Sequence, residues 1–313
     1  MNTPSFSGVH RFSAEFMTTP FEVLFSGIDS KYAREASEAI FEEIGHLEKL
    51  LNRHDPTSEI SRINSLEPGE EMRIGWEIFS CLDISFRLSR QTAGAFDINT
   101  PSLLKYGRNP FSRMWKGRRR EAVPPVELIR KADGFSAVRP DRESSPPDLD
   151  LGGIGKGFAL DSLRPILADW EIPDALIHGG TSTALAVGRP DPEQAGWPVG
   201  VGGGGTGLGV PKRVHLRNRA LSGSGLEVKG AHITDPRTGR SACRHTAAWV
   251  SHPSAAESDA LSTAFIVMSD REIDELCRKR PEIWALTIGS GGTYRLYNPD
   301  ALKEKTMSLE ETK

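Results

Sequence analysis

The feature that most constrains the fold is an amphipathic stretch over residues 30–55, SKYAREASEAIFEEIGHLEKLLNRHD. Its apolar residues recur at intervals of three and four, which places them on one face of an α-helix. They are Ala33, Ala36, Ile40, Ile44, Leu47 and Leu51. We predict a helix here with Ser30 as its N-cap. The segment before it, residues 16–27, has the β-branched and aromatic content that is typical of a strand.

The rest of the chain mixes the same two kinds of element. Apolar spacing and turn residues predict further helices, at residues 75–92, 156–170, 256–268 and 270–279. Short apolar runs separated by turns predict strands at 174–180 and 183–188, antiparallel strands within 195–250, and a strand pair near the end of the chain. The pattern indicates an α+β fold with mixed or antiparallel sheets flanked by helices, in a single domain of one or two lobes.

Composition excludes several classes of protein. The chain has 313 residues and a formal net charge of −3, so it has no electrostatic footprint for nucleic acid or for an anionic membrane. It contains no apolar run of about 18 residues that predicts a transmembrane helix. Its three cysteines are widely spaced and form no CxxC pair. The N-terminal residues lack the pattern of a secretory signal, and a cytoplasmic location is expected.

Two glycine-rich stretches compete as phosphate-binding loops. Residues 200–210, GVGGGGTGLGV, precede a strand-like segment, and we interpret them as a hairpin tip. Residues 150–161, DLGGIGKGFALD, precede a predicted helix. Glycines there let the backbone approach a ligand, the helix N-terminus offers free N–H groups, and Lys156 carries a point charge for a phosphate. Taken alone, this motif fits a phosphate cradle and a simple strand-to-helix turn equally well.

Two further segments carry groups with possible chemistry. In SDALSTA, residues 258–264, Asp259 and Thr263 are one helical turn apart and share a face. A carboxylate and a hydroxyl are hard oxygen ligands that suit Mg²⁺, although such a pair is also common on helix surfaces. In HITDPRTG, residues 232–239, His232 is placed before a turn and is a candidate acid or base.

In their order along the chain, eight segments resemble the ApbE family, the FAD:protein FMN transferases. They are MTTPFEV, SEISRIN, GAFDINT, DLGGIGKGFALD, IHGGTSTALAVG, LSGSG, HITDPRTG and SDALSTAFIV. The resemblance implies a T-fold-related α+β domain over residues 15–300, an N-terminal extension over 1–14 and a flexible tail over 301–313. It also implies a flavin-transferring enzyme. Such an enzyme cuts the pyrophosphate of FAD with Mg²⁺, transfers FMN to a threonine of a target flavoprotein and releases AMP.

The resemblance also implies roles for individual residues. FAD contacts carry over to Met17, His54, Ala95, Phe96, Asp97, Asp150, Lys156 and Ile233. Metal ligands carry over to the Gly153 carbonyl and to the side chains of Asp259 and Thr263. Lys156 is expected to assist phosphoryl transfer electrostatically, and His232 is the candidate base for the acceptor threonine.

Three positions depart from the common pattern of the family. Thr18 stands where a glycine is usual, His54 where an aromatic residue is usual, and Thr181 where an aspartate is usual. Two other functions therefore stay open. One is an FAD pyrophosphatase that transfers FMN to water, and the other is a flavin-binding protein without turnover. The oligomeric state and the acceptor protein are not indicated by the sequence.

Overall fold

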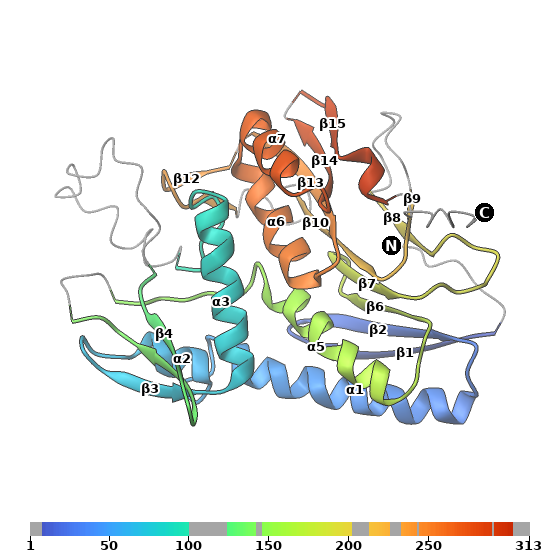
Figure 1. Ribbon diagram of the computed structural model, residues 1–313, viewed down its shortest axis with the longest axis horizontal. Helices are drawn as coiled ribbons and strands as arrows, with labels where there is room; N and C mark the ends of the chain where they lie inside the picture. The colour runs from blue at the N-terminus through green and yellow to red at the C-terminus, as the bar shows by residue number, and fades with distance from the viewer. Residues whose placement is uncertain are drawn as a thin grey trace, which may run out of the picture.

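A computed structural model describes residues 8–99, 124–141, 146–201, 213–225, 233–242, 244–289 and 291–302 (Figure 1). Its central element is an eight-stranded sheet with the order β1-β2-β6-β7-β10-β13-β14-β15, and each neighbouring pair is antiparallel. The strands are β1 (Val9–Phe16), β2 (Thr19–Ser26), β6 (Ala175–Gly179), β7 (Thr183–Val187), β10 (Arg219–Gly225), β13 (His245–His252), β14 (Trp284–Gly289) and β15 (Tyr294–Tyr297).

Helices cover one face of this sheet, and a pair of antiparallel strands packs on the other. The helices that pack on the first face are α1 (Ser30–Leu51), α5 (Gly155–Asp169) and α6 (Ala255–Val267). In Figure 1, α1 runs below β1 and β2, and α5 and α6 lie between α1 and the strands that end the sheet. On the opposite face, β8 (Trp197–Gly200) and β9 (Arg213–Leu216) pack Trp197 and Leu216 against Leu24 and Leu286 of the sheet.

A smaller unit lies beside the main sheet. It contains α2 (Glu59–Asn64), α3 (Trp76–Gln91) and a sheet of the order β3-β5-β4, made from β3 (Glu71–Ile74), β4 (Glu127–Lys131) and β5 (Gly134–Val138). One apolar core joins this unit to the main sheet, since Ile63 and Ala137 belong to the same buried cluster as Leu261 and Val250. The two parts therefore form one domain. The remaining elements are β11 (Thr234–Asp235), β12 (Arg240–Ser241), α7 (Asp270–Lys279) and the 3₁₀ turn η2 (Pro299–Leu302).

The structure confirms the α+β class with antiparallel sheets and corrects local details. The six apolar residues predicted to share one face of the first helix are all buried in α1. Its N-cap is Asp29, one residue before the predicted Ser30, and the Asp29 carboxylate accepts from the backbone N–H groups of Lys31 and Tyr32. No helix in the described part of the chain is long and apolar enough to cross a membrane.

The N-terminal boundary also differs from the prediction. The predicted strand over 16–27 is β2 alone, and a further strand, β1, begins at Val9 and pairs with β2 along its whole length. Part of the expected extension over 1–14 is therefore an edge strand of the main sheet. The expected tail over 301–313 lies outside the described residues from residue 303 onward.

Candidate active site

A buried carboxylate lies where α5 and α6 meet. Asp259 of α6 is 3% exposed. Its Oδ2 is 3.5 Å from Nζ of Lys156 and 3.2 Å from the backbone nitrogen of Gly157, both in the first turn of α5. A buried carboxylate is stable when a cation and hydrogen-bond donors surround it, and this site supplies both. The glycine-lysine motif therefore faces the predicted metal-binding helix.

This arrangement leaves the Gly153 carbonyl available. Gly157 donates its N–H to Asp259, and in the described part of the chain it makes no backbone hydrogen bond to the Gly153 carbonyl one helical turn earlier. Among the described residues, no backbone N–H outside the regular elements donates to Gly153, so that its oxygen has room for another partner. A Cβ at Gly153 would lie 3.4 Å from Cε2 of Phe96 and 3.5 Å from Oγ1 of Thr263. The predicted ligands Gly153, Asp259 and Thr263 are thus neighbours.

These groups fit Mg²⁺ better than a softer metal. The described residues contain no cluster of three or more His, Cys, Asp or Glu side chains that is suited to a metal. One carboxylate, one hydroxyl and one carbonyl are hard oxygen donors, and they leave positions for water and for phosphate oxygens. Such a partial shell is typical of Mg²⁺ in phosphate-handling enzymes.

Asp161, at the end of the glycine-lysine motif, has a role that sequence reasoning missed. Its carboxylate accepts from Oγ of Ser254 at 2.6 Å and from the backbone nitrogens of Ala255 and Ala256 at 2.9 and 3.0 Å. These are donors at the N-terminus of α6, which otherwise lack intrahelical partners. Ser254 is the N-cap of α6, and Asp161 supplements it by accepting from the first N–H groups of the helix that carries Asp259.

Asp150 is partly engaged within the protein. Its Oδ1 accepts from the backbone nitrogen of Gly152 at 2.9 Å, and its Oδ2 is 3.3 Å from a guanidinium nitrogen of Arg53. Arg53 also pairs with Asp148. The Asp150 side chain is 45% exposed, so it retains accessible surface for a ligand. Arg53 is a second residue that the sequence did not reveal, since nothing in its local pattern distinguishes it from a solvated arginine.

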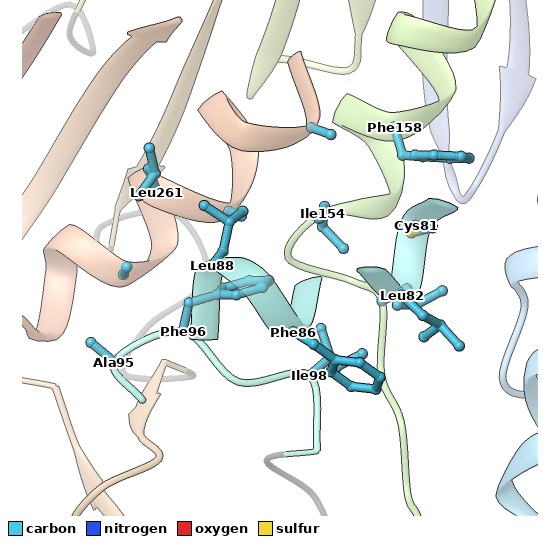
Figure 2. Close-up of a cluster of buried hydrophobic side chains, with 14 of the residues drawn as sticks. Cys81, Leu82, Phe86, Leu88, Ala95, Phe96, Ile98, Ile154, Phe158 and Leu261 are labelled. Carbon is cyan, nitrogen blue, oxygen red and sulfur yellow. The ribbon is translucent and has the colours of Figure 1, made fainter. Parts of the chain in front are cut away.

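Ala95 and Phe96 belong to the apolar core. Both are buried, and Figure 2 shows them among side chains from α3, from the loop before α5 and from α6. Phe96 therefore packs beside Gly153 from within the core. Asp97 follows in a turn, where its Oδ1 accepts from the backbone nitrogen of Asn99 at 2.8 Å. The roles of these three residues toward FAD stay predictions.

Met17 lies in the two-residue turn between β1 and β2. Met17 and Thr18 have φ values of 50° and 58°, the left-handed region that favours glycine or asparagine. Met17 packs against two core clusters, and its backbone nitrogen donates to Oε1 of Glu48 at 2.6 Å. Thr18, which stands where the resemblance led us to expect glycine, thus adopts a backbone conformation that is strained for a residue with a side chain.

The remaining predicted residues have different positions. His54 is exposed in a turn, and its backbone nitrogen donates to Oδ1 of Asn52. Ile233 is half-buried against the same core as Phe96. The turn after Ile233 is tied to the end of α6 and the start of α7, because Arg237 bonds the Val267 carbonyl and pairs with Glu272. His232, the candidate base, lies outside the described residues.

Comparison with known proteins places the chain in a family. The model of the ApbE family matches residues 17–287, which is most of the sequence. The chain belongs to the ApbE family. Its fold agrees, since the structure of the Pseudomonas stutzeri flavinyl transferase ApbE in its apo form superposes with a TM-score of 0.72 at 23% identity, covering 94% of this chain and 97% of the other. The ApbE protein of Thermotoga maritima gives the same TM-score and identity, with 92% and 97% covered.

Relatives of this chain carry the name FAD:protein FMN transferase. A protein of Chlamydia muridarum named FAD:protein FMN transferase is 25% identical over 280 residues, covering 82% of this chain and 83% of the relative. A protein of Treponema pallidum with the same name is 26% identical over 287 residues, covering 81% and 76%. This chain is therefore similar over 82% and 81% of its length to two proteins named FAD:protein FMN transferase.

Proposed function

We propose that this protein is a Mg²⁺-dependent FAD:protein FMN transferase, which attaches FMN to a threonine of a target flavoprotein and releases AMP. The observation that carries the proposal is the cluster at the α5–α6 junction. There, Lys156 and the buried Asp259 lie 3.5 Å apart, and Thr263 and Gly153 are beside them. Family membership and the names of the relatives support flavin transfer. The cytoplasm is the location that we expect from the sequence.

In this proposal, different residues of the chain bind the metal and the phosphate oxygens. Asp259, Thr263 and the Gly153 carbonyl would hold Mg²⁺, which offsets the charge that develops on the pyrophosphate oxygens. Lys156 adds a positive charge beside the same oxygens and orients them. Its carbon stem packs beside Gly179 of β6, where a Cβ would lie 3.6 Å from Cβ of Lys156. Because Cβ of Lys156 packs against Gly179, the ammonium group of Lys156 approaches the cluster from the side of β6.

The transfer step is a substitution at the FMN phosphorus. The threonine hydroxyl oxygen of the acceptor forms a bond to the FMN phosphorus, and the bond from that phosphorus to the bridging oxygen breaks. AMP leaves with the bridging oxygen. The hydroxyl proton passes to a base, for which His232 is the predicted residue.

One experiment tests this function against the two alternatives. The protein is incubated with FAD and Mg²⁺, with and without a flavoprotein domain that bears the threonine acceptor, and AMP and protein-bound flavin are measured. We expect flavin covalently attached to the domain together with AMP. AMP without attachment would identify a pyrophosphatase, and bound flavin without AMP would identify a flavin-binding protein.

A variant tests the metal assignment. Asp259→Ala should abolish AMP release, because the remaining hydroxyl and carbonyl are neutral and hold Mg²⁺ too weakly. The control is Asp274→Ala on α7, whose carboxylate pairs with Arg278 on the surface and should leave turnover unchanged. Unchanged AMP release by Asp259→Ala would refute the metal site.

A further inference from the structure

Strand β10 presents two serine hydroxyls to the helical layer. Ser222 and Ser224 are two residues apart, so both side chains lie on the same face of the strand, which packs on α6. Oγ of Ser224 is 2.9 Å from Oγ of Ser262 and 3.3 Å from Oγ1 of Thr263. Oγ of Ser222 is buried and has no hydrogen-bond partner among the described residues. The two serines therefore share one face of β10, but only Ser224 contacts the hydroxyls of α6.

The hydroxyl protons around Thr263 can be assigned by counting donors. Ser262 donates its proton to the carbonyl of Asp259, at 2.8 Å. Its oxygen then accepts the proton of Ser224 at 2.9 Å, the shorter of the two distances open to that serine. A serine hydroxyl has one proton, so Ser224 has none left for Thr263.

The hydroxyl proton of Thr263 points toward an acceptor within the protein and away from the proposed metal position. Its possible acceptors are the Asp259 carbonyl and Oγ of Ser224, both at 3.3 Å. In either case the Thr263 oxygen receives no proton from this group of hydroxyls, and its lone pairs stay free. An oxygen with free lone pairs is what a cation requires.

We propose that Ser224 is a positioning residue of the metal site, which holds the Thr263 hydroxyl in the orientation that binds Mg²⁺. A threonine in a helix divides between two side-chain rotamers, because its hydroxyl can bond back to the preceding turn. A hydrogen bond donated by Thr263 to Oγ of Ser224, 3.3 Å away, holds the rotamer in which Oγ1 is 3.5 Å from the Cβ position at Gly153. This inference rests on the proposed function, since it assigns a role toward the same metal.

Direct binding of Mn²⁺, used as a spectroscopic substitute for Mg²⁺, tests the proposal without turnover. Free Mn²⁺ is measured by electron paramagnetic resonance during titration of the full-length protein. Ser224→Ala should bind Mn²⁺ about three- to tenfold more weakly, the range that corresponds to the loss of one ordinary hydrogen bond. Ser222→Ala is the matched control and should bind Mn²⁺ as the unmodified protein does. Ser224→Thr keeps the hydroxyl and should restore affinity.

A double-mutant cycle separates positioning from a general structural effect. Thr263→Val removes the proposed ligand while keeping the shape of the side chain. If Ser224 acts through Thr263, Ser224→Ala should weaken Mn²⁺ binding no further in the Thr263→Val background. An equal further loss in that background would overturn the proposal.

The same titration distinguishes failure of this inference from failure of the proposed function. If Asp259→Ala binds Mn²⁺ as well as the unmodified protein, the metal does not bind here and the proposed function loses its metal site. If Asp259→Ala loses Mn²⁺ while Ser224→Ala retains full affinity, the metal site stands and the role of Ser224 is refuted.

Discussion

Replacing Gly157 with alanine probes the contact on which the site depends. A Cβ at this position would lie 2.2 Å from the carbonyl oxygen of Ala255, 2.6 Å from its carbonyl carbon and 2.9 Å from Cα of Ala256. All three are backbone atoms of α6, so no side-chain rotation relieves the overlap. Carbon atoms in contact are normally about 3.5–4.0 Å apart, so α5 must move away from α6 by about 1 Å or more.

The expected loss of stability follows from two opposing effects. Overpacking in a rigid interior costs about 1–3 kcal/mol, and a backbone obstacle favours the upper end of that range. Alanine regains up to about 1 kcal/mol over glycine in a helix. We therefore expect Gly157→Ala to lower the free energy of unfolding by about 2 kcal/mol. The same shift lengthens the 3.2 Å bond from Gly157 to Asp259, so Mn²⁺ affinity should fall as well.

Urea unfolding followed by circular dichroism measures the effect, and the same helix provides a control. A Cβ at Gly155 would meet nothing closer than 3.9 Å. Gly155→Ala should therefore leave stability unchanged or raise it by up to about 1 kcal/mol. Equal stabilities for the two variants would refute the close approach of α5 and α6 at Gly157.

Three further predictions concern stability. Burial lowers the pKa of His178 to about 4 from an ordinary value of 6.5, so stability should be complete above pH 6.5 and decline by roughly 3 kcal/mol as the pH falls to 4. His178→Gln should reduce the dependence of the free energy of unfolding on pH, measured by urea titration. An unchanged dependence would show that His178 is not its cause. Asp161→Ala should cost about 2 kcal/mol because the Ser254 hydroxyl and the N–H groups of Ala255 and Ala256 lose their acceptor, and a loss no larger than that of a surface control would contradict this role. Thr18→Gly should raise thermal stability by about 1 kcal/mol because of its positive φ, whereas Ser13→Gly within β1 should lower it.

The main elements could be predicted where the apolar period is long. In α1 the six predicted residues are buried. Apolar residues recur at helical spacing through all 22 residues of this helix, so the pattern is easy to recognise in the sequence. Strand β1 was missed for a physical reason. The turn that joins it to β2 consists of Met17 and Thr18, which lack the glycine or asparagine that normally marks such a turn. The strain of this turn is accommodated by tertiary contacts, which local sequence does not report.

The site could be predicted in part, for a similar reason. Gly153, Asp259 and Thr263, which the resemblance to the family indicated, lie close to one another in the fold, and their role toward a metal stays a prediction. Arg53 and Ser224 were not predicted. Their roles depend on Asp150 and Thr263, which are distant in sequence and close in the fold. Residues that act through another residue leave little trace in a local pattern.

The two contacts that residues 150–161 make with α6 bear on protein engineering. Lys156 and Gly157 meet Asp259, and Asp161 holds the first residues of the same helix. A single residue inserted between them would rotate Asp161 by about 100° around the axis of α5, so one of the two contacts would be lost. Chimeras built from two relatives should therefore exchange the segments 150–169 and 254–267 as a pair, because each sets the register of the other.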